Sequence, residues 1–412
     1  MARINEIIGY KKEVEKLKSI CDFLKNTDKY RGFGVHLPKG LLICGDRGVG
    51  KTLFAEALTV DCEREIFYTY GMDLNIKEIK KIFKRARRIA NSIVLIDDID
   101  YLDVEEDSDI YEQLVEEIDN CKNGEVFVVA TADDKEDLPD YFVHRFDSDM
   151  IIELDPPKIE EACQIFKPIF VEDKIEEAFN INDFCCFARN CTYAYAKKAF
   201  NDASRSAVYE GCERITMQHI IKAGLLLKGE ELAEEFDAAS AYHEAGHAAV
   251  NLLLGGDAAF IVLLGSYGGY FKEKNLVTKT YHDKERRYIV SVAGKACEEI
   301  FTGTSSIGSY TDLTNVSAEI EADVKVLASQ GFEYFDSTEL NSPAYNDTLA
   351  KKVQTDIQKY YDKAKEIIVE NKQLIEAFVE KLKDKFYLLH SEIYEIYNSY
   401  IESLPKTDRK VG

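Results

Sequence analysis

Residues 45–52 read Gly45-Asp46-Arg47-Gly48-Val49-Gly50-Lys51-Thr52, a complete G-x-x-x-x-G-K-T pattern. The short apolar run 41–44 precedes this loop, and a helical pattern over 53–58 follows it. Glycines in such a loop let backbone N–H groups surround phosphates, the lysine reaches the β- and γ-phosphates, and the threonine hydroxyl binds Mg²⁺. We therefore predict an ATP and Mg²⁺ site formed by this loop and by Leu53, which adjoins it.

A second apolar run, residues 92–96, ends in two carboxylates, Asp97 and Asp98. A strand that ends in an acid beside a phosphate-binding loop is typical of the carboxylate that holds Mg²⁺. Asp97 is the natural metal-side acid, and Asp98 stands where a water-activating carboxylate is wanted. The alternative is that both residues simply begin the acidic, solvated stretch 97–119.

The order of helical and β patterns indicates the architecture. Short β runs alternate with helical patterns up to Asp155-Pro156-Pro157, which predicts a parallel sheet covered on both faces. Only helical patterns follow, to about residue 228. After a charged connector, residues 236–404 read as helices, except for a partly β segment at 260–271 and a turn-rich loop at 303–312. We predict three parts: an α/β nucleotide-binding domain (1–155), a helical domain (156–228) and a mostly α-helical domain (236–404).

Near its start the third part carries His243-Glu244-Ala245-Gly246-His247, an H-E-x-x-H pattern. Residues four apart on a helix lie on one face, so both imidazoles reach one Zn²⁺ ion while Glu244 stands beside its water. A carboxylate in that place acts as the general base of a zinc hydrolase. The alternative is a helix that carries two of the chain's seven histidines by chance.

Composition limits the class of protein. The 52 basic and 75 acidic side chains give a net charge of −23, so we expect no nucleic-acid partner. Ten cysteines without a C-x-x-C pair favour a reducing, cytoplasmic location. We also expect no membrane segment, because the best apolar candidate, 248–264, is interrupted by Gly255, Gly256 and Asp257.

Together these motifs resemble the FtsH family of AAA+ zinc proteases along nearly the whole chain. Ile8-Gly9 resembles the family's adenine-contacting entry, and residues 293–301 resemble its G-G-R-x-A-E-E-L helix. Residues 309–313 match its S-N-D-L segment, which implies Asp312 as the third zinc ligand. Glu298 or Glu299 is the fallback ligand. The resemblance implies an AAA+ ATPase with a helical lid over 156–228, followed by a zinc peptidase domain.

The chain also departs from the family. The two N-terminal membrane helices and the aromatic pore loop that grips substrate have no counterpart in the sequence. Asp98 replaces the family's Glu, Ala132 replaces its sensor Asn, and Arg145 is the one arginine that remains of the usual pair at the subunit-facing finger. These changes concern ATP hydrolysis and translocation, whereas the phosphate loop and the zinc pattern are intact.

We therefore expect a zinc metalloendopeptidase that acts on protein or peptide substrates and carries an attenuated AAA+ motor. A homo-hexamer is expected because such nucleotide sites borrow an arginine from the next subunit. Two alternatives stay open: a nucleotide-dependent assembly or regulatory protein with an idle or structural zinc site, and an ATP-independent peptidase. A membrane-bound partner also stays open.

Overall fold

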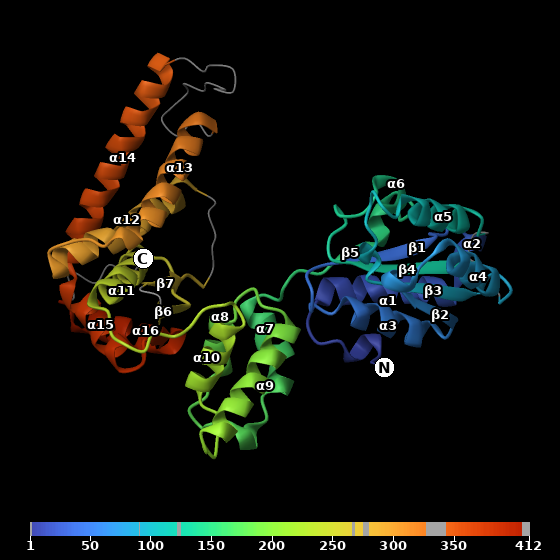
Figure 1. The fold of residues 1–412 in the computed structure, drawn as a ribbon, viewed down its shortest axis with the longest axis horizontal. Coiled ribbons are helices and arrows are strands. Elements are labelled where there is room, and N and C mark those ends of the chain that lie inside the picture. The colour runs from blue at the N-terminus through green and yellow to red at the C-terminus, as the bar shows by residue number, and fades with distance from the viewer. Residues whose placement is uncertain are drawn as a thin grey trace. The chain divides into compact units, whose positions relative to one another are not determined.

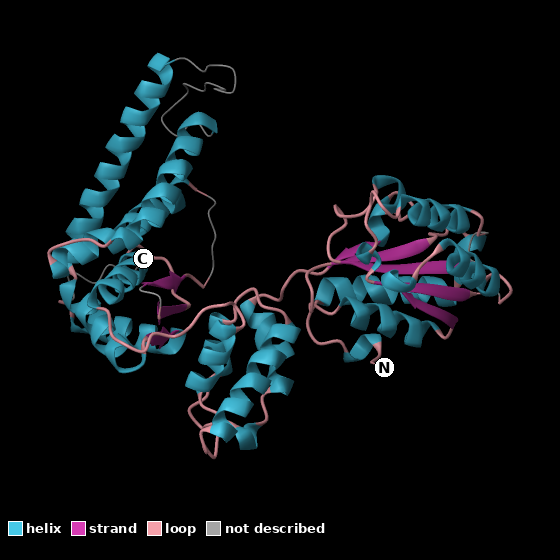
Figure 2. Cartoon of the chain, in the orientation of Figure 1, coloured by secondary structure: helices cyan, strands magenta, loops and turns pink. Residues whose placement is uncertain are grey.

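The computed structural model describes residues 2–89, 91–121, 125–265, 268–274, 280–326 and 343–405. The chain forms two compact units, one of residues 1–176 and 190–215 and one of residues 177–189 and 216–412. Figures 1 and 2 show that strands are concentrated in the first unit and that helices dominate the second. The three-part division at residues 155 and 228 stays a prediction.

The first unit is built on a five-stranded parallel sheet in the order β2-β3-β4-β1-β5. Its strands are β1 (Gly40–Cys44), β2 (Glu65–Tyr70), β3 (Ser92–Asp97), β4 (Val126–Ala132) and β5 (Ile151–Glu153). Its helices are α1 (Lys11–Lys25), α2 (Thr27–Gly32), α3 (Lys51–Cys62), α4 (Ile76–Ala86), α5 (Ser108–Asp119), α6 (Asp140–Val143), α7 (Ile159–Phe166) and α9 (Tyr193–Tyr209).

Helices cover both faces of this sheet, α1 and α3 on one side and α4, α5 and α6 on the other (Figure 1). Every residue of β1, β3 and β4 is buried, which explains why these strands read as continuous apolar runs. In α4 the apolar side chains recur at helical spacing, so Ile79, Ile82 and Phe83 enter the core while the basic residues stay outside. The predicted parallel α/β fold is confirmed.

The second unit combines helices with a small antiparallel sheet in the order β7-β6-β8. The strands are β6 (Phe260–Leu264), β7 (Gly268–Lys272) and β8 (Tyr387–Leu389). The helices are α8 (Ile181–Phe187), α10 (Met217–Leu226), α11 (Ala238–Leu253), α12 (Tyr281–Thr302), α13 (Tyr310–Val326), α14 (Pro343–Glu370), α15 (Lys372–Lys385) and α16 (His390–Ser403). The helices in the described ranges include none long and apolar enough to span a bilayer.

Helices α11 and α12 pack closely because glycine stands at their contact. A Cβ atom at Gly246 would lie 2.6 Å from Cys297 Cβ and 3.0 Å from the Ala293 carbonyl oxygen. Small residues on both sides of this contact, among them Ala249 and Ala293, are fully buried. The pair forms the centre of the second hydrophobic core, and α15 also packs on α11.

Three details differ from the sequence prediction. Strands β5 and β8 were not expected, and α13 begins at Tyr310, inside the segment predicted as a loop. Each of the two strands has three residues, which is too short for an alternating pattern to emerge. Strand β8 directly follows α15, whose end is marked by Phe386 in the left-handed region at φ 64°, and it is held by pairing with the distant β6.

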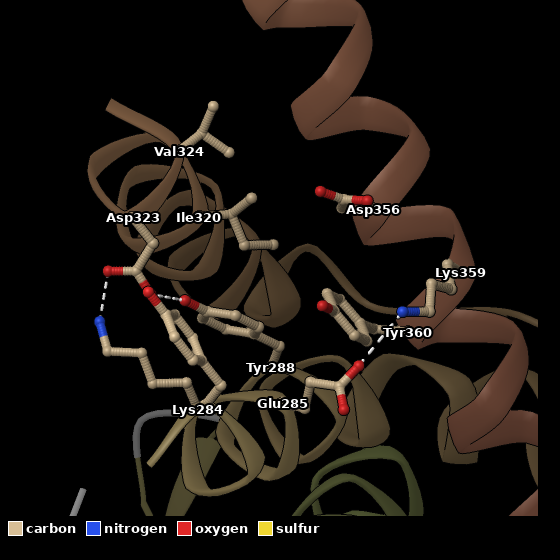
Figure 3. A pocket seen from close by; sticks show the side chains of 10 residues that line it. Lys284, Glu285, Tyr288, Ile320, Asp323, Val324, Asp356, Lys359 and Tyr360 are labelled. Atoms are coloured by element: carbon tan, nitrogen blue, oxygen red, sulfur yellow. Dashed lines mark hydrogen bonds and ion pairs between the residues drawn. The ribbon is translucent and has the colours of Figure 1, made fainter. Parts of the chain in front are cut away.

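A cavity of about 250 Å³ lies between α12, α13 and α14 (Figure 3). Figure 3 shows two groups of paired side chains around it. In one, Asp323 accepts hydrogen bonds from Lys284 and from the Tyr288 hydroxyl. On the other side, Lys359 Nζ lies 3.1 Å from Glu285 Oε1. These pairs connect α12 to α13 and α14.

Candidate functional site

Helix α11 places two imidazoles on one face. Its N-terminus is capped by Asp237, whose carboxylate accepts hydrogen bonds from the backbone N–H groups of Ala239 and Ser240. His243 Nε2 and His247 Nε2 lie 3.0 Å apart. Asp312 Oδ2, from the first turn of α13, lies 3.0 Å from His243 Nε2 and 3.4 Å from His247 Nε2. The two rings and one carboxylate therefore converge on one point.

The other ring nitrogens are fixed by partners on α12. His243 Nδ1 lies 2.6 Å from Glu298 Oε1, and His247 Nδ1 lies 2.6 Å from the Val290 carbonyl oxygen. Since both partners accept hydrogen bonds, each Nδ1 atom carries a proton, and Nε2 is the ring nitrogen that faces Asp312. Glu298 also accepts a hydrogen bond from the Ser306 backbone N–H at 2.5 Å, so it connects His243 to the segment that leads to Asp312.

The charges around this cluster suit a dication. Burial acts to lower the pKa of His243, but hydrogen bonds with Asp312 and Glu298 outweigh it and raise that pKa to about 10. Burial acts to raise the pKa of Asp312, but the two imidazoles hold it well below its usual range. Two imidazole nitrogens and one carboxylate oxygen are a donor set that zinc accepts, with a fourth position left for water. The residues therefore fit a catalytic zinc ion.

Glu244 is buried next to this cluster, and burial raises the pKa of its carboxyl group. Gly269 of β7 makes room for it, because a Cβ atom there would lie 3.0 Å from Glu244 Cγ. The sheet of the second unit thus presents its β7 strand to the side chain predicted as the general base.

The two fallback ligands point elsewhere. Glu298 contacts the Nδ1 side of His243, away from the convergence point. Glu299 pairs with Lys295 at 2.9 Å and Lys365 at 3.0 Å. Of the acidic residues considered from the sequence, Asp312 is the one that meets both Nε2 atoms, within the cluster whose ligand atoms all lie within 4.8 Å of one another.

Sequence reasoning matched Gly294 as part of the 293–301 segment but gave it no role. A Cβ atom at this position of α12 would lie 2.5 Å from both His243 Nε2 and His247 Nε2. The helix backbone therefore approaches the imidazoles where a side chain would block the convergence point. A glycine inside an otherwise helical pattern, next to a motif already matched, is the signal that could have found it.

The phosphate-binding loop adopts backbone conformations with positive φ at its glycines. Gly45, Gly48 and Gly50 have φ values of 148°, 86° and 116°, which side chains with a Cβ atom rarely adopt. Asp46 and Arg47 are exposed, and Val49 is buried beneath the loop. Helix α3 begins at Lys51, and Leu53 is 41% exposed on its first turn.

The Asp97 carboxylate accepts hydrogen bonds from three hydroxyl groups. The Thr131 hydroxyl lies 2.6 Å from its carboxylate, and the hydroxyls of Thr52 and Tyr68 each lie 3.0 Å away. Asp98 follows in the left-handed region at φ 51°, with its backbone N–H donating to Thr131 Oγ1. Burial and the neighbouring Asp97 raise the pKa of Asp98. Thr52 and Asp97 are therefore adjacent, as a shared Mg²⁺ ion requires.

The lysine of the loop also has a partner that the sequence analysis missed. Lys51 Nζ donates to the Gly45 carbonyl oxygen at 2.7 Å and to Asp133 Oδ1 at 2.5 Å. Asp133 directly follows β4, the strand beside β1. Since neighbouring parallel strands end at the same edge of a sheet, the position of Asp133 after a predicted strand was the available signal.

The remaining predicted contacts lie in the first unit. Gly9 has φ 80° and packs on Ile165, because a Cβ atom there would lie 2.7 Å from Ile165 Cδ1. Ile8 is 46% exposed. Arg145 pairs with Asp119 within the unit, with 3.0 Å between Nη2 and Oδ2. Its role toward a neighbouring subunit stays a prediction.

Comparison with known proteins finds similarity along nearly the whole chain. Residues 41–154 match the family described as "ATPase family associated with various cellular activities (AAA)". An "ATP-dependent zinc metalloprotease FtsH 2" of a Thermoanaerobacter species is 26% identical over 95% of this chain and 82% of its own length. Proteins named "ATP-dependent zinc metalloprotease FtsH" from Streptobacillus moniliformis and Mycoplasmopsis pulmonis are each 25% identical, over 95% and 99% of this chain.

The chain is FtsH-like. The resemblance stated from the sequence is confirmed, as is the fold class: an AAA domain with a parallel five-stranded sheet precedes a mostly helical region. This FtsH-like chain spans 63% of the length of the Streptobacillus and Mycoplasmopsis proteins.

The close approach of α12 predicts that Gly294→Ala prevents zinc binding at the candidate site although all three candidate ligands are kept. The added methyl group would occupy the space between the two Nε2 atoms and push the rings apart. We expect the purified variant to lose most of its zinc, measured by atomic emission. Gly268→Ala is the control, because a Cβ atom there meets nothing within 4 Å. Equal zinc contents in the two variants would contradict the prediction.

Proposed function

We propose that this chain is an ATP-binding zinc metalloendopeptidase that degrades protein substrates. The observation that carries the proposal is the convergence of His243, His247 and Asp312 on one point, with buried Glu244 beside it. Three protein ligands leave a position open, whereas a structural zinc site is closed by four. The names of the relatives support the same activity.

Each residue has a defined task in this chemistry. A zinc ion bound here supplies a polarised water and an electrophile for the scissile carbonyl group. Glu244 takes the proton of the attacking water and delivers it to the leaving amine. Burial raises the pKa of its carboxyl group toward neutral pH, and proton transfer is efficient when the pKa of the acid or base lies near the working pH. Glu298 and Val290 keep the two imidazoles in the orientation that the ligands need.

The nucleotide site supports an attenuated motor. Lys51, Thr52 and Asp97 hold ATP and Mg²⁺, and Asp98 stands in the place of the water-activating carboxylate. Asp is one methylene shorter than Glu, so its carboxylate is withdrawn from the attacking water. A homo-hexamer places Arg145 of one subunit at the nucleotide of the next. Slow hydrolysis then favours substrates that are already unfolded.

Removing the proposed base separates catalysis from metal binding. We expect Glu244→Gln to keep about one zinc per chain while casein degradation falls by about 10³-fold or more, because metal-binding and proton transfer use different groups. Asp312→Ala should instead lose zinc, because it removes one of three ligands. Zinc content and casein degradation are measured on the same preparations. An Asp312→Ala protein that binds zinc like the wild type would place the third ligand elsewhere.

Lengthening the second acid should speed the motor. A water-positioning carboxylate must reach within about 2.6–3.2 Å of its partner, and Asp98→Glu restores one methylene of reach. We expect a several-fold increase in the steady-state ATPase rate. Asp98→Asn is the matched control and should lower the rate, since it keeps the length but removes the base. Brisk hydrolysis by the wild type, with unfolding of a stable reporter, would refute the attenuated motor.

One observation favours a second candidate, an ATP-independent peptidase. The Lys51 ammonium group is held by Asp133, an acid of the same chain, which makes it less available to phosphate. Casein degradation with ATP, with a non-hydrolysable analogue and without nucleotide separates the candidates. We expect nucleotide to increase degradation, because it completes the ring. Equal rates under all three conditions would favour the second candidate.

A further inference from the structure

The contact between Lys51 and Asp133 occupies the charge that should meet the nucleotide. The Lys51 side chain is 5% exposed, and its Nζ lies 2.5 Å from Asp133 Oδ1. The Asp133 side chain is 45% exposed, so this carboxylate reaches the buried ammonium group from the open edge of the sheet. In a phosphate-binding loop this lysine binds the β- and γ-phosphates. Here the Asp133 carboxylate, another anion, contacts it instead.

The backbone of Asp133 is fixed independently of its side chain. Its N–H group donates to Asp100 Oδ2 at 2.7 Å, and its carbonyl oxygen accepts from the Gly45 N–H group at 3.0 Å. Both contacts would persist after a change of the Asp133 carboxylate. The side chain is thus presented to Lys51 by a held backbone at the start of the phosphate-binding loop.

Nucleoside diphosphates and triphosphates need different numbers of hydrogen bonds from this lysine. An ammonium group has three donors, and among the described residues the structure gives two of them partners, Gly45 and Asp133. One donor is left, which suffices for a β-phosphate oxygen. A γ-phosphate needs a second donor, so it must displace the Asp133 carboxylate or lie beside its charge. Asp97 and Asp98 at the same edge add to the negative field.

We propose that Asp133 determines the nucleotide preference of this site, because it competes with the γ-phosphate for Lys51 and so favours ADP over ATP. The proposal rests on the nucleotide binding proposed above and specifies which nucleotide dominates. Mg²⁺ does not remove the difference, since Thr52 and Asp97 hold it for both nucleotides. Asp133 is a specificity-determining residue.

The test is calorimetric titration of the full chain with MgADP and with Mg²⁺ and AMP-PNP, a non-hydrolysable ATP analogue. The wild type should bind ADP more tightly than AMP-PNP. Asp133→Asn should raise the affinity for AMP-PNP by about tenfold and that for ADP by less than about threefold, because a like charge a few ångströms from the γ-phosphate is removed. Asp134→Asn is the matched control: it neutralises the next residue, whose carboxylate caps the Glu136 N–H group, and should change neither affinity.

The outcomes separate the inference from the function on which it rests. A wild type that prefers AMP-PNP over ADP overturns the inference without any variant, as does an Asp133→Asn protein whose two affinities rise equally or stay unchanged. Asp133→Ser removes the same charge and should reproduce the shift of Asp133→Asn. A wild type and variants that bind neither nucleotide would instead refute nucleotide binding itself, while the zinc site would be unaffected.

Discussion

The proposed zinc site depends on the close packing of α11 on α12. Gly246 on one helix and Gly294 on the other carry no Cβ atom of their own at the contact, so the two backbones approach until the imidazoles lie against α12. This approach puts Val290 and Glu298 within hydrogen-bonding distance of the Nδ1 atoms. The orientation of the ligands therefore follows from helix packing, and only then from the spacing of the histidines along α11.

The nucleotide site depends on strand order. Because β3, β4 and β1 are parallel neighbours, their carboxyl ends bring Asp97, Thr131 and the phosphate-binding loop to one edge. The hydroxyls of Thr52, Tyr68 and Thr131 then donate to the Asp97 carboxylate, and the turn after β4 brings Asp133 to the same edge. The same arrangement that assembles the proposed Mg²⁺ ligands also introduces the acid that meets Lys51.

The sequence predicts what local spacing determines. The phosphate-binding loop, the strand before it and the helix that carries His243 and His247 follow from patterns within about ten residues, and the structure has each of these elements where expected. Strands β5 and β8 could not be predicted, because three residues form a strand only when a distant partner is present. The roles of Gly294 and Asp133, and the contact that Glu298 makes with His243 in place of the ligand role considered for it, were missed for the same reason: they come from contacts across 47–82 residues of chain. The assignments of Ile8 and Arg145 still rest on the resemblance.

Glu298 gives the site a further property. One buried carboxylate holds His243 and also the Ser306 N–H group, which lies on the path from α12 to Asp312. One side chain therefore links the first proposed ligand to the segment that leads to the third. The set of proposed ligands should therefore assemble and come apart cooperatively. Loosening of the 303–309 segment should also change the position of an imidazole on another helix.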